Sequence, residues 1–95
     1  MNGDSFEWDE DKAVTNWQRH GVSFEQARKV FRDPFAVEWI DDREDYGEVR
    51  FNRLGMCDGV ILYVSYTDRG ERTRIISARR AVKHERENYY RENAP

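Results

Sequence analysis

The sequence predicts a single α+β domain in which helices cover one face of a four-stranded antiparallel meander sheet. Three observations lead to this fold class. Two stretches near the N-terminus space their apolar residues as amphipathic helices do, and a final stretch is rich in helix formers. Between them, four stretches alternate apolar and polar residues, and the turns joining the last three are too short for anything but antiparallel connections.

The first helix is predicted over residues 9–20, after a short N-terminal edge strand that residues 6–8 can form by their alternation. The carboxylate of Asp9 can accept from the free amides of the first turn, and Gly21 tolerates the left-handed backbone that ends a helix. The stripe expected to turn away from solvent consists of Ala13, Trp17 and His20.

A second helix is predicted to begin at Ser23, because Ser23 and Gln26 have the spacing of a capping box. It should end at Asp33, since the residue before Pro34 is pushed out of the helical region. The apolar stripe of this helix consists of Phe24, Ala27, Val30 and Phe31.

The hairpin turns of the meander are predicted at Asp58-Gly59 and at residues 68–70. Residues 60–66 are apolar on both faces, which suits the centre of the sheet. A closing helix is expected over residues 79–92, giving the order β-α-α-β-β-β-β-α. The four strands are predicted at residues 35–40, 48–56, 60–67 and 71–78.

The length of 95 residues predicts one domain over residues 1–95, with residues 1–5 and 93–95 expected to fray. No run approaches the roughly 18 apolar residues that span a bilayer, and the N-terminus lacks the order of a signal peptide. We therefore expect a cytoplasmic protein without a membrane partner. The one cysteine, Cys57, lacks companions for a disulfide or a zinc site and is expected to be structural.

The net charge of −3 hides an asymmetry along the chain. Residues 1–48 carry 13 acidic and 6 basic side chains, whereas residues 49–95 carry 6 acidic and 10 basic ones, nine of them Arg. Arg donates to phosphate in a bidentate manner and stays charged at any relevant pH. The C-terminal half is therefore expected to bind a polyanion, with a solvated charged surface as the alternative.

Two candidate catalytic groups come from different parts of the chain. Strand alternation places Glu48, Arg50 and Asn52 on one face, where Glu48 and Arg50 would lie side by side. The alternative for that pair is an exposed ion pair. His20 is either catalytic or only a capping and packing residue at a helix end.

The Arg-rich stretch from residue 66 to residue 80 is a candidate phosphate site. The hydroxyl of Thr67 and the guanidinium of Arg69 lie near a turn that can clamp a phosphate. More ligands are expected where the last strand gives way to the closing helix, because free amides at a helix start favour anions. The candidate phosphate ligands of this region are Arg72, Arg74, Ser77, Arg79 and Arg80.

No metal ion and no cofactor are expected. The acidic residues 41–45 lack the alternating spacing and the glycine of a calcium loop, which favours a solvated hairpin loop. The sequence also contains no glycine-rich phosphate loop, nucleophile elbow or His-Glu-x-x-His pair, which argues against NTPases, serine hydrolases and zinc proteases.

Six segments in order resemble the BrnT family of type II toxins, from Phe6 to about Tyr90. They are FEWDEDKA at 6–13, RHGVSFEQA at 19–27, VFRDP at 30–34, GEVR at 47–50, YTDR at 66–69 and RIISARRA at 74–81.

The resemblance implies a RelE-like fold, a bacterial endoribonuclease that arrests translation, and a cognate BrnA-like antitoxin. That antitoxin would also bind its operator, so the toxin would contact DNA only through the antitoxin. The matching polar positions are His20, Glu48, Arg50, Thr67, Arg69, Arg74, Ser77 and Arg79.

These residues predict RNA cleavage by attack of a 2′-hydroxyl on the adjacent phosphate, which needs no metal if cationic donors stabilise the developing charge. Arg69 and Arg74 are expected to do so, while Glu48 or His20 takes the 2′ proton. The alternative is a non-catalytic module whose Arg-rich face binds a partner protein or nucleic acid. The residues expected to orient the phosphate are Arg50 and Arg79.

Overall fold

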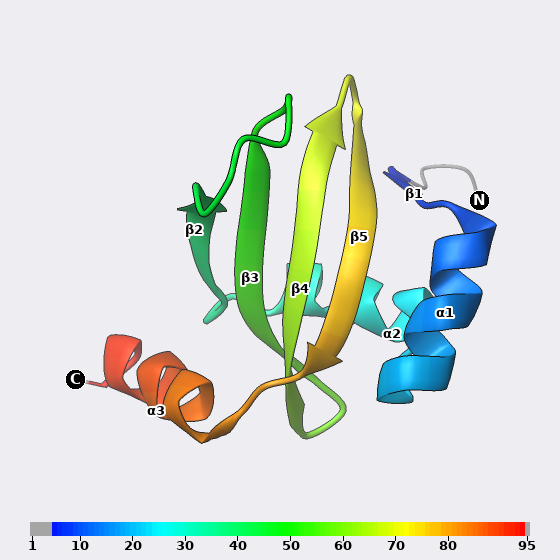
Figure 1. The fold of residues 1–95 in the computed structure, drawn as a ribbon. Helices are drawn as coiled ribbons and strands as arrows, with labels where there is room; N and C mark the ends of the chain where they lie inside the picture. Colours follow the sequence, from blue (N-terminus) through cyan, green and yellow to red (C-terminus); the bar gives the residue numbers. More distant parts are fainter. Residues whose placement is uncertain (1–4, 95) are drawn as a thin grey trace.

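A computed structural model of the chain describes residues 5–94 (Figure 1). The expected fraying of residues 1–4 and 95 lies outside the described residues. The strands are β1 (Phe6–Glu7), β2 (Val37–Asp41), β3 (Arg50–Cys57), β4 (Val60–Arg69) and β5 (Arg72–Arg80). The helices are α1 (Glu10–His20), α2 (Phe24–Arg28), the 3₁₀ helix η1 (Lys29–Arg32) and α3 (Lys83–Glu92).

The strands form one five-stranded mixed sheet in the order β1-β5-β4-β3-β2. The predicted antiparallel meander is confirmed for β2 to β5, with β4 at the centre of the sheet. The short edge strand expected near residues 6–8 is present as β1, but it joins this sheet parallel to β5, with Phe6 opposite Thr73, so the sheet has five strands and is mixed and not purely antiparallel. A two-residue strand has too little alternation to reveal which distant strand it will join.

The junction between β5 and α3 also differs from the prediction. β5 continues through Arg80, and the amide of Ala81 still donates to the carbonyl of Ile61 at 2.9 Å. The closing helix therefore begins at Lys83 and not at Arg79. The helix propensity of residues 79–81 is overridden here by pairing with residues 61–63 of β4.

Both predicted ends of α1 are confirmed. The carboxylate of Asp9 accepts from two amides of the first turn at 2.8 and 3.1 Å, and Gly21 has the left-handed φ of 64°. Of the predicted stripe, Ala13 packs against the core, but the prediction is wrong for Trp17, which is 56% exposed, and for His20, which is exposed too. The buried residue of α1 is Asn16.

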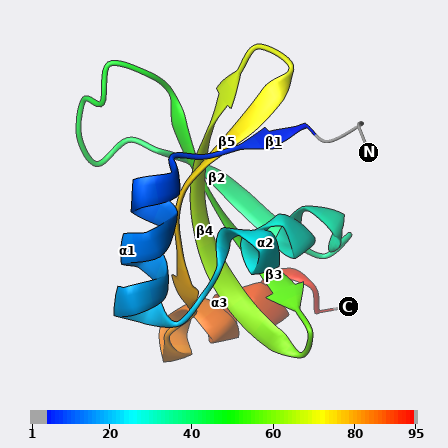
Figure 2. The same ribbon diagram turned by 90° about the vertical axis from the view of Figure 1, so that its right-hand side faces the viewer.

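Asn16 is buried because its side chain completes the edge of β5. Its amide nitrogen donates to the carbonyl of Ala78 at 2.8 Å and to the carbonyl of Val22 at 2.9 Å, and its oxygen accepts from the amide of Ala78 at 3.0 Å. The side chain thus makes the pair of hydrogen bonds that a neighbouring strand would make. Figure 2, which looks onto the β5 side of the molecule, shows α1 standing beside this strand.

The second helical segment is a short α-helix followed by a 3₁₀ turn. The predicted capping box is present, with the hydroxyl of Ser23 accepting from the amide of Gln26 and the Gln26 side chain accepting in return. η1 then approaches β3 so closely that a Cβ at Gly55 would lie 2.7 Å from the Cβ of Val30. Only glycine fits this contact without a shift of the helix.

Two apolar clusters lie on opposite faces of the sheet. α2 and η1 lie behind the sheet in Figure 1 and cover the larger cluster, whereas α3 covers only the lower end of the front face. The upper part of that front face is left open. The larger cluster contains Val22, Phe24, Ala27, Val30, Cys57, Leu62, Val64, Ile75 and Ala78. The smaller cluster contains Leu54, Ile61, Ala81 and Tyr89.

Candidate functional site

A row of polar residues crosses all five strands on the open face of the sheet. The strand register pairs each member of the row with the next, and paired residues project from the same face. We call this set the polar row. From β2 to β1, its members are Asp41, Arg50, Thr67, Arg74 and Glu7.

Two further rows lie below the polar row on the same face. In the second row, the hydroxyl of Ser65 donates to the side-chain oxygen of Asn52 at 2.8 Å. The face thus changes from charged, near the upper loops, to apolar beneath α3. The second row is Trp39, Asn52, Ser65 and Ser77. The third row is Val37, Leu54, Tyr63 and Arg79.

A bulge in β5 brings Ser77 and Arg79, the β5 members of the second and third rows, onto the face of the polar row. Tyr66 pairs with Ile75 but Ser65 pairs with Ser77, so Ile76 is an extra residue. Strict alternation would place Ser77 and Arg74 on opposite faces, because they are three residues apart. The bulge corrects this offset, as bulges beside functional sites often do.

Arg50 is held from two sides. Its Nε lies 3.1 Å from a carboxylate oxygen of Glu48, and its guanidinium lies 4.1 Å from the centre of the Tyr46 ring. The expected proximity of Glu48 and Arg50 is therefore present, although Glu48 precedes β3 and does not belong to it. The side chains of this ion pair are 26% and 35% exposed, so solvent reaches both.

Arg74 lies on the other side of the polar row and is also paired. Its Nη1 is 2.8 Å from a carboxylate oxygen of Glu7, and both side chains are about 30% exposed. Thr67 lies between the two arginines and is buried, and its hydroxyl donates to the carbonyl of Val49 at 2.6 Å. Thr67 thereby ties the segment before β3 to the middle of the row.

Asp41 fixes the loop that follows β2. Arg43 donates to its carboxylate through Nε at 2.8 Å and Nη2 at 2.6 Å, and the hydroxyl of Tyr46 donates at 3.2 Å. The bonds from Arg43 outweigh burial and hold the pKa of Asp41 well below its usual range. Asp41 is thus permanently ionised near neutral pH, and the expectation of a solvated loop is wrong for this buried residue.

Arg69 and Arg72 face each other at the tip of the β4–β5 hairpin. Both are exposed, and Gly70 between them has a left-handed φ of 64°. Within residues 5–94, no carboxylate pairs with either guanidinium. Two like charges held opposite one another repel, and a bound anion would relieve that repulsion.

Arg79 and Arg80 lie on β5, so their expected location at a helix start is wrong, while their binding of phosphate stays a prediction. Glu85 occupies that place, since its carboxylate accepts from the amide of Val82 at 2.9 Å. Arg79 donates to both oxygens of Glu85 at 2.8 Å and lies 4.2 Å from the centre of the Tyr63 ring. The bonds to Glu85 raise the pKa of Arg79.

His20 lies apart from the polar row. It ends α1 and lines a hollow of about 300 Å³ between that helix and β5, where Ser77 is also found. The structure therefore brings His20 together with Ser77, and Glu48 together with Arg50 at the other side of the face.

Sequence reasoning missed four residues that shape this face. Glu7 could have been found from the alternation of residues 6–8, which turns it away from Phe6. Ser65 was hidden within an apolar strand, and Tyr46 and Asp41 have no signal beyond a polar loop. Each of the four contacts a residue that has already been described.

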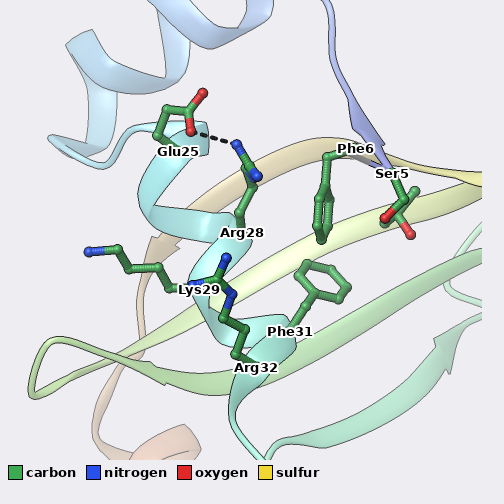
Figure 3. Close-up of a pocket in the computed structure, with 8 residues that line it drawn as sticks. Ser5, Phe6, Glu25, Arg28, Lys29, Phe31 and Arg32 are labelled. Carbon is green, nitrogen blue, oxygen red and sulfur yellow. Dashed lines mark hydrogen bonds and ion pairs between the residues drawn. The ribbon is translucent and has the colours of Figure 1, made fainter. Parts of the chain in front are cut away.

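Another basic hollow lies on the helix side of the sheet, as Figure 3 shows. Its volume is about 500 Å³, and Phe6 and Phe31 contribute apolar surface to it. Arg28 pairs with Glu25 and Lys29 with Asp58, each at 2.9 Å. Arg28 and Lys29 therefore already have acidic partners, while Arg32 also lines the hollow. These cations come from α2 and η1 and not from neighbouring strands of the open face, so the hollow has less to offer a reacting phosphate.

Within residues 5–94, no group of three or more His, Cys, Asp or Glu side chains is arranged to hold a metal ion. Cys57 is a free, buried thiol, and burial raises its pKa. None of the described helices is both long and apolar enough to cross a membrane.

The chain matches a known protein family. Residues 8–85 match the family described as "Ribonuclease toxin, BrnT, of type II toxin-antitoxin system". No curated protein matches the chain at a significant level. The family match spans α1 to the start of α3 and so includes most of the polar row. It confirms the resemblance found in the sequence, and the chain belongs to the BrnT family of ribonuclease toxins of type II toxin–antitoxin systems.

Proposed function

We propose that this protein is an endoribonuclease that cleaves RNA at the polar row without a metal ion. The observation that carries the proposal is the alignment of Arg50, Thr67 and Arg74 across three neighbouring strands of an open sheet face, with Arg69 and Arg72 beyond them. Cationic donors fixed on a sheet stabilise a charged transition state without reorganising during the reaction.

In this mechanism the 2′-oxygen of one nucleotide attacks the adjacent phosphorus, and the bond from phosphorus to the 5′-oxygen breaks. Arg69 and Arg74 stabilise the charge on the phosphoryl oxygens, while Arg50 orients the phosphate. The 5′-oxygen leaves with a proton from water. The products are a 2′,3′-cyclic phosphate and a 5′-hydroxyl.

Glu48 is the favoured general base. Its carboxylate lies beside Arg50, so a phosphate bound by Arg50 would carry its 2′-hydroxyl toward Glu48. His20 is the alternative base, but it lies at the α1 side of β5. Arg72 and Ser77 supply further contacts to the RNA backbone, and Arg79 does so through the guanidinium N–H groups that Glu85 leaves free. Arg80 pairs with Leu62 and so projects from the other face of the sheet, away from the polar row.

The ion pairs explain how an acidic protein can bind RNA. Glu48 pairs with Nε of Arg50 and Glu7 pairs with Nη1 of Arg74, so the other N–H groups of each guanidinium can bind phosphate oxygens. Each carboxylate thus offsets the charge of its arginine without blocking it. Arg69 and Arg72 have no carboxylate partner within residues 5–94 and would make the first contact with the RNA.

We further propose a BrnA-like antitoxin as the partner, acting in the bacterial cytoplasm, where free toxin would arrest translation. An inhibitor bearing acidic side chains would complement Arg69 and Arg72 and cover the polar row. Contact with DNA would then occur only through the antitoxin.

The test is to incubate the purified protein with a defined single-stranded RNA in EDTA, without ribosomes, and to identify the ends of the fragments. Fragments with 2′,3′-cyclic phosphate ends are expected. Fragments with only 3′-hydroxyl ends, or cleavage that needs added divalent metal, would contradict the mechanism. A parallel reaction with ribosomes separates a ribosome-dependent enzyme from an inactive one.

A second candidate function is a non-catalytic module that only binds a protein or nucleic acid through this face. It is favoured by one observation: Arg50, Arg74 and Arg79 all have acidic partners within the chain. Such a module would bind RNA without changing its length, with or without ribosomes.

A further inference from the structure

A hollow of about 420 Å³ lies below the polar row, between the sheet and α3. Trp39 and Tyr63 line it from the sheet, and His84, Asn88 and Arg91 line it from α3. The catalytic proposal does not use any of these side chains. The hollow is large enough for a purine or pyrimidine ring.

Trp39 gives the hollow a flat aromatic wall. Its ring contacts Tyr63 edge to face, with the centres 5.7 Å apart and the planes at 75°. The residue is still 36% exposed, although it lies in the middle of β2 on the same face as Asp41. Arg79 lies against the Tyr63 ring, so Trp39 offers the more accessible aromatic surface for stacking.

The position of Trp39 relative to the polar row fits the spacing of a nucleotide chain. Trp39 and Asp41 are two residues apart on one strand, which corresponds to about 7 Å. Adjacent nucleotides of an extended single strand are separated by a similar distance. A phosphate on the polar row would therefore place a neighbouring base beside Trp39.

The α3 side of the hollow carries groups that can read a base edge. His84, Asn88 and Arg91 recur at helical spacing and so project from one side of the helix. The side-chain oxygen of Asn88 accepts from Arg91 at 3.4 Å, which leaves its amide N–H groups to donate. An amide that donates and accepts is the side chain best suited to a Watson–Crick or Hoogsteen edge.

We propose that this hollow binds one nucleobase of the RNA, next to the phosphate on the polar row, and sets the nucleotide preference of the enzyme. The proposal rests on the proposed function, because it takes the polar row as the phosphate site. Trp39 stacks on the base, and Asn88 with His84 hydrogen-bonds to its edge. The preference then arises from α3 and the affinity from Trp39.

The binding experiment uses short single-stranded RNAs with 2′-O-methyl groups, which have no 2′-hydroxyl to attack. The variant Trp39→Ala is expected to bind them about ten-fold more weakly, because stacking of one base is lost. Trp39→Phe retains an aromatic face and should recover most of the affinity. Trp17→Ala, which removes an exposed tryptophan of α1, is the matched control and should bind as the wild type does.

The cleavage experiment uses a library in which the positions flanking a single cut site are randomised. Asn88→Ala should change the base preferred at one flanking position. On RNA sequences for which the two proteins share the same preference, the cleavage rate of the variant should stay within a few-fold of the wild-type rate. Circular dichroism and thermal unfolding establish that each variant is folded. An Asn88→Ala profile identical to the wild type, together with unchanged binding by Trp39→Ala, overturns the proposal.

The two proposals fail in different ways. If the wild type cuts no RNA but Trp39→Ala still weakens binding of the 2′-O-methyl RNA, the base site stands and the catalytic proposal falls. If cleavage proceeds normally in both variants with the same preference, the catalytic proposal stands and the base site falls. If Trp39→Ala weakens only antitoxin binding, the hollow is a protein interface and the base site is overturned.

Discussion

The carboxylate of Glu7 on β1 lies 2.8 Å from the guanidinium of Arg74 on β5, although 67 residues separate them in the chain. The contact forms because β1 runs parallel to β5 and pairs Glu7 with Arg74 directly. The shortest strand of the protein therefore has a definite role, which is to hold the arginine that faces the scissile phosphate in the proposed mechanism.

Replacement of Glu7 by Gln should lower kcat and KM together. Arg74 loses the partner that orients it, which we expect to lower kcat about ten-fold, since small misplacements of catalytic groups are costly. The carboxylate also no longer competes with phosphate, so KM should fall. Steady-state kinetics on a defined RNA measures both. Glu10→Gln, an exposed change on α1, is the control, and an unchanged kcat in Glu7→Gln would show that Arg74 needs no orienting partner.

Replacement of Arg74 by Ala should reduce RNA cleavage about 10²- to 10³-fold, the usual loss for one donor to a transition-state oxyanion. The fold should remain, because Arg74 is partly exposed and its loss creates no buried unpaired group. Cleavage rates and circular dichroism check the two statements. Lys83→Ala, whose side chain is 82% exposed, should behave as the wild type. Survival of toxicity in the double variant Arg69→Ala, Arg74→Ala would mean that the site lies elsewhere.

A comparison of Glu48→Gln with His20→Gln identifies the general base. A positioned base contributes about 10²- to 10⁴-fold, so Glu48→Gln should lose activity within this range and His20→Gln should keep nearly all of it. The readout is kcat at several pH values, where loss of the base removes the acid limb of the profile. The reverse pattern would assign the base to His20 and move the reacting phosphate toward β5.

Much of the fold was predictable because it depends on local chemistry. The turn at Asp58-Gly59 has φ values of 49° and 86°, and the capping residues of α1 and α2 act as their types suggest. The polar row was predictable in part, since Arg50 and Arg74 follow from strand alternation. What stayed hidden depends on contacts between distant segments, such as Glu7 with Arg74 and Asn16 with Ala78.

The bulge and the misplaced stripe of α1 show why these parts were hidden. An extra residue at Ile76 changes the face of every residue that follows it, and no turn residue marks it in the sequence. On α1, the sequence pattern predicts that Trp17 is buried, because it is large and apolar, and that Asn16 is exposed. The structure shows the opposite, because hydrogen bonds to the backbone hold Asn16 in a buried position, and Trp17 and His20 are both exposed.

Replacement of Asn16 by Ala should destabilise the protein by about 2 to 4 kcal/mol. The amide and carbonyl of Ala78 would lose their partners at a buried edge, and each unsatisfied buried group costs about 1 to 3 kcal/mol. Urea unfolding measures the difference. Val14→Ala on the exposed side of the same helix should change the free energy of unfolding by less than about 0.5 kcal/mol. Equal stability of both variants would mean that water can replace Asn16.

Asp33 gives the stability a pH dependence that Tyr89 controls. Burial raises the pKa of Asp33, but bonds from the Tyr89 hydroxyl at 2.6 Å and from the amides of Met56 and Phe35 outweigh it, so the pKa is lowered. A lowered pKa in the folded state stabilises the protein above the ordinary carboxyl value of about 4. This stabilisation is lost as the pH falls below that value.

Tyr89→Phe should therefore cost about 2 kcal/mol at pH 7, the typical contribution of a hydrogen bond to a charged group. The difference from the wild type should narrow as the pH falls below about 4, the ordinary carboxyl value, toward the lowered pKa of Asp33 in the folded protein. Urea unfolding at pH 7 and pH 3 tests both statements. Tyr90→Phe, at a residue 59% exposed, is the control and should have no effect at either pH. A cost that does not depend on pH would indicate lost packing and not the carboxylate.

The side chain of Asn16 also bears on how this protein behaves among copies of itself. An uncovered strand edge is a template on which a second chain can add a strand, and such addition leads to aggregates. On β5, two residues of β1 cover the upper edge and Asn16 occupies the hydrogen-bonding groups of Ala78 below. Loss of Asn16 would thus leave part of the β5 edge unpaired on folded molecules, where a strand of a second molecule can bind. Precipitation would then increase with protein concentration even where the fold survives.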